Sequence, residues 1–216
     1  NYQGHLYSIT KMKLPHNRSR IEAFSDGVFA FAATLLVVSV GTQAESSILQ
    51  VDWMVFLSFG VSFFALVGLW SVHYNFFRRT NYMDNMIIGL NAVLLFLILY
   101  YIFPIKSLIN SWTGALQINA DEFSSLFQLY SLGFLLIFTC YALMYLRVYK
   151  KANNSNMTHL FYARHFGLFV LVALVSIVIA ELQLGLYYGL PGIVYVLLGP
   201  FCYFHASYFQ KKTNAF

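Results

Sequence analysis

Charged residues are scarce in this sequence: Asp, Glu, Lys and Arg together make up only 10% of its 216 residues. A soluble domain carries about 25% of such residues. Hydrophobic residues make up 59% of the chain and aromatic residues 19%, and the mean hydropathy is +0.65. A chain of this composition would expose too much apolar surface to stay dispersed in water, so we predict an integral membrane protein.

Cysteine and the motifs of common catalytic sites are also lacking. The two cysteines, Cys140 and Cys202, both lie inside apolar runs without metal-ligand spacing, so we interpret them as packing or lipid-facing residues. His159 and His165 are six residues apart and do not share a helix face as paired ligands would. The sequence has no His-Glu-x-x-His, no Gly-x-Ser-x-Gly and no paired aspartates within apolar runs. We therefore expect no enzyme, no cofactor and no fixed metal.

The formal net charge is +5, but its distribution does not indicate a nucleic-acid partner. The basic residues fall in short clusters between apolar runs, which is typical of membrane topology signals. The first long apolar run follows a basic, polar N-terminus and is too long for the apolar core of a signal peptide. We therefore expect the mature chain to keep its first helix, with membrane lipid as its surroundings.

Six segments are long and apolar enough to cross a membrane, for which a helix needs about 20 residues. They are about Arg20–Val40, Trp53–Tyr74, Met86–Ile105, Phe123–Leu146, Tyr162–Leu182 and Leu190–Phe209. The third ends at Pro104 and Lys106, whereas the sixth follows the breaker at 189–192 and is interrupted by Pro200, which predicts a kink. No polar linker divides the chain, so we predict one all-α domain over residues 1–216.

The basic residues predict that both termini face the cytoplasm. If the N-terminus lies there, twelve of the 13 Lys and Arg residues fall on that side and Lys106 alone falls on the other. The twelve are Lys11, Lys13, Arg18, Arg20, Arg78, Arg79, Arg147, Lys150, Lys151, Arg164, Lys211 and Lys212. Positive charge gathers on the cytoplasmic side of multi-pass proteins, and an even number of spans agrees with this. We expect a multi-pass protein of the cell membrane.

Acidic residues favour the opposite side. Those in or beside the outer connections are Glu45, Asp52, Asp121, Glu122 and Glu181. A negative outer mouth would raise the local concentration of cations. Simple solvation of the loops explains the same pattern equally well.

The first predicted span has charge at its mouth and two different faces. Arg20, Glu22 and Asp26 stand at its start, where charge is costly unless it serves a partner, a cavity or a conduction path. At 3.6 residues per turn, one narrow apolar stripe bordered by Thr34 contains Phe24, Phe31, Leu35 and Val38. On most membrane helices such a stripe faces lipid or packs within the bundle, so the periodicity alone does not make it a pore lining.

The polar side of this span needs partners, because a buried carboxylate without them is costly. We hypothesise one hydrogen-bonded cluster that fixes the first helix and is made of Ser25, Asp26, Trp70, His73 and Asn91. Arg20 lies about one and a half turns below, where it caps this cluster or stays in the membrane interface. Alternatively, Trp70 and His73 are interfacial anchors of an aromatic belt.

The run Arg-x-x-x-Phe-Ser-Asp, formed here by Arg20, Phe24, Ser25 and Asp26, resembles the signature of the transmembrane protein 175 family. The following segment, Gly27–Val37, is similar to the first helix of that family. The family comprises potassium channels of animal endosomes and lysosomes, with shorter relatives in prokaryotes. Six spans with cytoplasmic termini match one of its repeats, so the chain resembles the single-repeat, prokaryotic type.

The resemblance implies a homotetramer whose central pore is lined by the first helix of each subunit. Rings of apolar side chains narrow the pore in this family, and the matching positions here are Phe31, Leu35 and Val38, with Thr34 beside them. Phe31 departs from the pattern, because isoleucine or leucine is expected in the innermost ring. Potassium and other monovalent cations are the implied partners, and proton permeation has been attributed to the animal form.

The Thr-Val-Gly-Tyr-Gly filter of ordinary potassium channels is missing, and the only Tyr-Gly is Tyr188-Gly189 in a predicted outer turn. Selection by backbone carbonyls is therefore not expected. A narrow apolar ring favours potassium modestly, because potassium loses water more readily than sodium, so we predict weak to moderate potassium preference. A proton-coupled secondary transporter is the alternative, with an inner aspartate and Glu181 as a proton relay, although transporters usually place binding groups at midplane.

Overall fold

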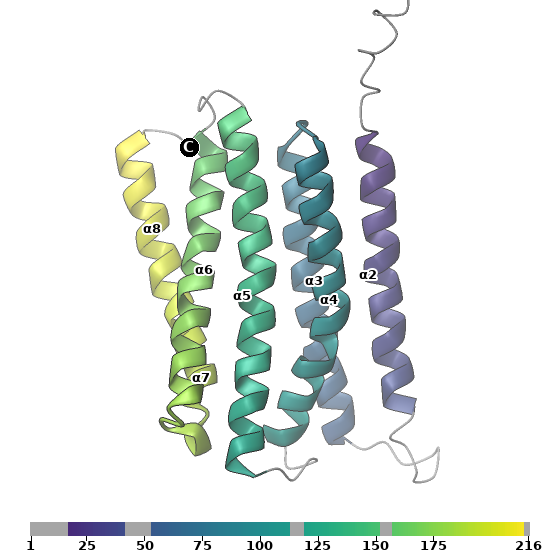
Figure 1. The fold of residues 1–216 in the computed structure, drawn as a ribbon, viewed down its shortest axis with the longest axis vertical. Helices are drawn as coiled ribbons and strands as arrows, with labels where there is room; N and C mark the ends of the chain where they lie inside the picture. Colours follow the sequence, from purple (N-terminus) through teal and green to yellow (C-terminus); the bar gives the residue numbers. More distant parts are fainter. Residues whose placement is uncertain (1–16, 42–52, 113–118, 152–156, 214–216) are drawn as a thin grey trace, which may run out of the picture.

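In the computed structural model the chain is a bundle of long helices that stand side by side (Figure 1). The structure describes residues 17–41, 53–112, 119–151 and 157–213. The long helices are α2 (Arg18–Gly41), α3 (Trp53–Arg79), α4 (Asn85–Trp112), α5 (Ala120–Lys151), α6 (Met157–Glu181) and α8 (Leu198–Thr213). Every regular element within the described ranges is helical, which confirms the predicted all-α fold.

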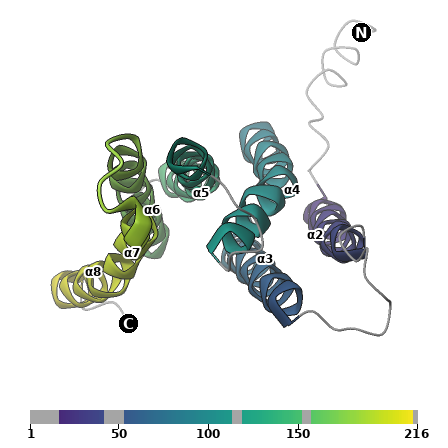
Figure 2. The ribbon, with the colours of Figure 1, turned by 90° about the horizontal axis from the view of Figure 1, so that it is seen from below.

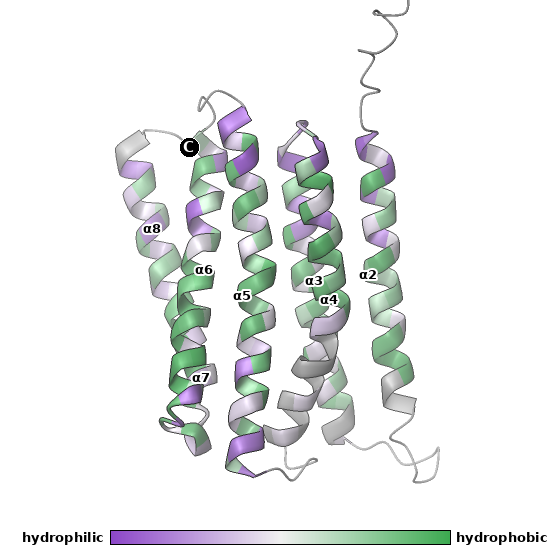
Figure 3. Cartoon of the chain, viewed as in Figure 1, coloured by the Kyte–Doolittle hydropathy of each residue, from purple (hydrophilic) through white to green (hydrophobic). Residues whose placement is uncertain are grey.

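Apolar residues fill the middle of these helices and polar residues gather toward their ends (Figure 3). Five helical stretches are long and apolar enough to span a membrane: Arg18–Val38, Phe56–Arg79, Ala120–Lys151, Met157–Glu181 and Leu190–Lys211. Helix α4 adds a shorter apolar stretch, Asn85–Tyr101. The chain is thus a multi-pass membrane protein. Five of the six predicted spans have the length and hydropathy of a membrane-spanning helix, and the third predicted span remains a prediction.

Helices α3 and α4 run several residues past the C-terminal ends of the apolar segments that predicted them. Helix α3 continues past Tyr74 to Arg79, and α4 continues past the expected end at Pro104 to Trp112. A proline within a helix removes one backbone hydrogen bond, and membrane helices tolerate that loss. The prediction that the third helix ends at Pro104 is therefore wrong.

The sixth predicted segment is interrupted, but one turn earlier than Pro200. After the short helix η1 (Leu186–Tyr188), Gly189 adopts a left-handed φ of 69° and the chain enters α7 (Leu190–Ile193). The tighter helix η2 (Val194–Leu197) then precedes α8, whose first turn contains Pro200. Because Pro200 has no amide hydrogen for the carbonyl one turn before it, the α-helical ladder is broken there.

Helices α2 and α8 lie at opposite edges of the bundle (Figure 2). Aromatic side chains fill the space between the central helices, as in the pair Phe76–Tyr145, whose ring centroids are 4.9 Å apart, and Phe138–Phe169, at 4.5 Å. Among the described residues, α2 makes its main contacts with α3 and α4. One side of α2 is therefore covered by its own chain and the other is not.

The contact between α4 and α5 depends on a small residue at position 133. A Cβ atom added at Gly133 would lie 2.5 Å from the ring of Tyr101, which is itself buried and stacked on Tyr130. We expect Gly133→Ala to lower the free energy of unfolding by about 1–2 kcal/mol, because the buried ring must move. Gly167→Ala on α6 is the matched control, since its added Cβ meets nothing within 4 Å. Thermal unfolding in detergent measures both, and equal midpoints for the two variants would contradict the expectation.

Candidate pore-lining helix and its polar contacts

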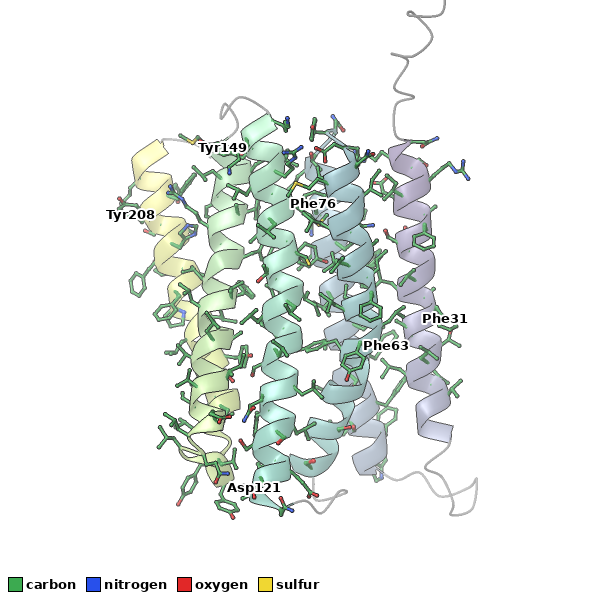
Figure 4. The ribbon with its side chains drawn as sticks, viewed as in Figure 1. Phe31, Phe63, Phe76, Asp121, Tyr149 and Tyr208 are labelled. Carbon is green, nitrogen blue, oxygen red and sulfur yellow. The ribbon has the colours of Figure 1, made fainter. Side chains whose placement is uncertain are left out.

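The structure gives α2 one covered and one uncovered face. Ser25, Phe29, Ala32 and Leu36 are buried against α3 and α4, with Ala32 at 0% and Leu36 at 1% exposure. The predicted stripe lies on the uncovered side: Phe24 is exposed, Phe31 is 56% exposed, and Val38 is 57% exposed. Figure 4 shows the side chain of Phe31 directed away from the rest of the bundle. The buried residues are spaced by three or four positions and the exposed ones by seven, so each set lies on one face of the helix.

The remaining predicted pore residues lie at the edges of this stripe. Leu35 is half-buried, whereas Thr34 is exposed. The Thr34 hydroxyl donates a hydrogen bond of 3.0 Å to the backbone carbonyl of Ala30 in the preceding turn. This local bond leaves the methyl group and the free lone pairs of Thr34 at the helix surface beside the apolar stripe.

Three of the five predicted cluster residues form a buried chain of hydrogen bonds. The Asn91 amide donates to Ser25 Oγ at 3.1 Å, and Ser25 Oγ donates to the carbonyl of Ile21 at 2.8 Å. The ring nitrogen Nε2 of His73 lies 2.8 Å from the Asn91 carbonyl oxygen, so Nε2 carries the proton. Ser25, His73 and Asn91 are all at least 97% buried, and together they tie α2 to α3 and α4.

The other two predicted residues form a separate pair at the surface. Trp70 Nε1 donates a hydrogen bond of 2.9 Å to a carboxylate oxygen of Asp26, and the indole stacks on Tyr74 at 5.7 Å. The predicted single cluster is thus divided in two. Successive residues of a helix are 100° apart, so Ser25 faces the interior and Asp26 faces the surface of the same turn. Arg20 is exposed at the start of α2.

The start of α2 has further contacts that were not predicted. Arg18 forms an ion pair with Glu22 at 3.0 Å and donates a hydrogen bond of 2.6 Å to the side-chain oxygen of Asn81. Arg18 and Glu22 are four residues apart, a spacing at which opposite charges commonly pair on a helix, so this ion pair could have been predicted from the sequence. Asn81 lies in the turn between α3 and α4, and no sequence pattern indicated its contact with α2.

Asp84 connects that turn to α5. It caps α4 by accepting a hydrogen bond of 2.9 Å from the amide of Ile87, and it accepts another of 3.0 Å from the hydroxyl of Tyr82. Arg147 of α5 forms an ion pair with it at 2.8 Å. Burial raises the pKa of the Asp84 carboxyl, but the hydrogen bonds from Ile87, Arg147 and Tyr82 outweigh that effect, so the pKa lies below its usual value.

Basic residues gather at one end of the bundle. The turn between α3 and α4, the end of α5 and the end of α8 all lie at the end where α2 begins (Figure 1). Described cations from these parts include Arg18, Arg79, Lys150 and Lys211. Lys11, Lys13, Glu45 and Asp52, which were also used for the predicted topology, lie outside the described residues. In the part of the chain that the structure describes, no three His, Cys, Asp or Glu side chains come together as a metal site.

Comparisons with known proteins agree with this geometry. The family described as "Endosomal/lysosomal potassium channel TMEM175" matches residues 20–104, less than half of the chain. A potassium channel of Marivirga tractuosa is 32% identical over 148 residues, which cover 62% of this chain and 60% of that protein. A crystal structure of a variant of the potassium channel MtTMEM175, bound to a nanobody–MBP fusion, has a TM-score of 0.66 and 27% identity, covering 93% of this chain and 96% of that one. The resemblance to the transmembrane protein 175 family is confirmed.

A second structure shares the fold. The crystal structure described as a lysosomal potassium-selective channel TMEM175 homolog from Chamaesiphon minutus has a TM-score of 0.56 and 24% identity, over 84% of this chain and 97% of that one. The chain spans less than two thirds of the curated relatives it matches, with 60% of the Marivirga tractuosa protein and 46% of a potassium channel of Chamaesiphon minutus. The matched family and these relatives are channels by name rather than enzymes, in agreement with the predicted lack of catalysis.

Proposed function

We propose that this chain is a subunit of a homotetrameric potassium channel of the cell membrane, with a central pore lined by α2. The observation that carries the proposal is the uncovered stripe of α2, where Phe31 and Val38 remain more than half exposed in a single chain. The opposite face is held by the buried hydrogen bond from Asn91 to Ser25, and Asn91 is itself bonded to His73, so these contacts fix the rotation of the helix. The matched relatives are potassium channels by name.

The chemistry of the stripe supports passage through an apolar constriction. Four copies around one axis would bring Phe31, Leu35 and Val38 into rings, and the polar groups on the other face of α2 are already engaged within the subunit. A narrow apolar ring excludes water and blocks conduction, and slight widening admits a partly dehydrated ion. Because potassium sheds water more readily than sodium, the expected selectivity for potassium is weak to moderate.

The orientation and assembly in this proposal have separate support. We assign the basic end of the bundle, where α2 begins and α8 ends, to the cytoplasmic side of the membrane. Both termini then lie in the cytoplasm, which requires an even number of spans and agrees with six. A groove of about 250 Å³ runs along α2 and α3 and is lined in part by Ala30, Ala33 and Val67. Small residues on a membrane helix allow close approach of a neighbouring helix, which suits a subunit contact beside the pore.

Liposome flux tests the proposed constriction. We expect vesicles that contain the purified chain to release potassium faster than sodium. Leu35→Ala would widen the ring and lower the barrier to entry of water, so potassium flux should rise on the order of tenfold and the preference for potassium should fall. Val37→Ala is the control, because Val37 is exposed on the same turn but lies outside the stripe and should leave flux unchanged.

Two results would contradict the proposal. Equal potassium flux in the wild type and in Leu35→Ala would show that Leu35 does not form the constriction. Saturating uptake that requires a proton gradient would instead favour the proton-coupled transporter.

A further inference from the structure

The basic end of the bundle has cations that no carboxylate of the described residues neutralises. The acids near this end are all engaged: Glu22 pairs with Arg18, Asp84 pairs with Arg147, and Asp26 accepts from Trp70. These three belong to α2 or to the turn before α4. No Asp or Glu occurs in residues 123–180 or 182–216, so the basic ends of α5, α6 and α8 have no acid of their own.

Of the basic residues at this end of the bundle, Arg164 lies furthest from the end of its helix. It is exposed and lies seven residues after the start of α6 at Met157, which corresponds to about 10 Å along the helix axis. The surrounding helix is one of the apolar spans. Among the described residues, no carboxylate lies within ion-pair distance of its guanidinium.

Arg164 lies beside the contact between α6 and α8. The neighbouring residue on α6, His165, packs against His205 of α8 with ring centroids 5.8 Å apart, and Phe161 packs against Phe209 at 5.2 Å. The position of Arg164 is therefore fixed on a rigid pair of helices rather than on a loop.

Exposed aromatic side chains surround this level of α8. Tyr203, Phe204 and Tyr208 are each at least 65% exposed, and Tyr208 lies at the outer edge of α8 in Figure 4. Tyrosine is enriched where the apolar core of a bilayer meets its headgroups. These residues indicate that Arg164 stands at the depth of the lipid headgroups, with the membrane rather than protein beside it.

We propose that Arg164 binds the phosphate of an anionic phospholipid, seated at the contact between α6 and α8. A guanidinium at this depth has no protein acid to pair with, and its rigid fork matches a phosphate by two parallel hydrogen bonds. Lys150 and Lys151, both exposed at the end of α5, add positive potential on the same side of the bundle. Charge complementarity thus selects an anionic lipid over a zwitterionic one. The inference rests only on the chain spanning a membrane and not on what the pore conducts.

The test measures lipid preference with the full chain in detergent micelles. Retention of phosphatidylglycerol and of phosphatidylcholine is compared by native mass spectrometry, with free glycerol phosphate as a third ligand. We expect the wild type to prefer phosphatidylglycerol and to show no retention of glycerol phosphate. Arg164→Gln should reduce the preference about fivefold, the usual contribution of one basic residue near an anionic membrane surface. Arg164→Lys, which keeps the charge but loses the guanidinium fork, should fall between the wild type and Arg164→Gln.

Arg78→Gln is the matched control, because Arg78 is an exposed arginine at the same end of the bundle but on α3. It should leave the lipid preference unchanged. The proposal is overturned if Arg164→Gln keeps the full preference, or if Arg78→Gln lowers it equally, since general surface charge would then explain binding. It is also overturned if Arg164→Gln changes the oligomeric state instead, which would make this face a contact between copies.

Discussion

Replacing Asn91 with alanine is expected to lower the free energy of unfolding by about 3 kcal/mol. Asn91 joins Ser25 to His73, and its loss leaves the Nε2 proton of His73 without an acceptor in a site that is 2% exposed. A buried polar group left without its partner costs about 1–3 kcal/mol, and two such groups are affected here. The expected fall in the thermal midpoint is about 6–12 °C for a chain of this length.

The control for this prediction is Asn75→Ala. Asn75 is an asparagine near the same level but on α3 rather than α4, and its amide donates to the carbonyl of Ser71 within its own helix at 2.8 Å. Its loss removes no contact between helices and should change the midpoint by less than about 3 °C. Thermal unfolding at one protein concentration and in one detergent compares the variants, because assembly makes the midpoint depend on concentration. Equal shifts for the two variants would show that the buried chain does not stabilise the fold.

The sequence allowed much of α2 to be predicted. A period of 3.6 residues per turn placed Phe31 and Val38 on a different helix face from Ser25. A charged residue near the end of a membrane span is costly without polar partners, so such partners were expected. Those partners were found because only a few polar side chains, among them His73 and Asn91, occur at comparable depth in the next two spans. Hydrogen bonds in the structure join them, although in two groups rather than one.

The contacts between distant segments could not be predicted in the same way. Arg147 and Asp84 are 63 residues apart, and so are Arg18 and Asn81. Whether such pairs meet depends on the rotation and length of each helix, and the hydropathy of the sequence gives no information about either. The extension of α4 past Pro104 to Trp112 is a related case, because local propensity favours a helix end at proline and no sequence pattern indicated otherwise.

Replacing Asp84 with alanine is the second large effect that we expect, a loss of about 3 kcal/mol at neutral pH. The carboxylate caps α4 through the amide of Ile87, accepts from Tyr82, and pairs with Arg147 of α5. Losing the cap costs about 1 kcal/mol, and losing charge-assisted hydrogen bonds costs about 1.5–3 kcal/mol. Glu22→Gln is the control, since the Arg18–Glu22 pair is partly exposed, lies within one helix and contributes less than about 1 kcal/mol.

The effect of Asp84→Ala should depend on pH in one direction. The pKa of Asp84 lies below its usual value in the folded chain, so folding favours the charged form. Its contribution is fully present above the pKa of the unfolded carboxyl, about 3.9, and is lost as pH falls through the lower folded value. The difference in thermal midpoint between wild type and Asp84→Ala should therefore stay constant from about pH 7 to 5 and shrink below about pH 4. A difference that grew on acidification would show that the carboxyl is protonated in the folded chain, and the ion pair to Arg147 would then not be what joins the α3–α4 turn to α5.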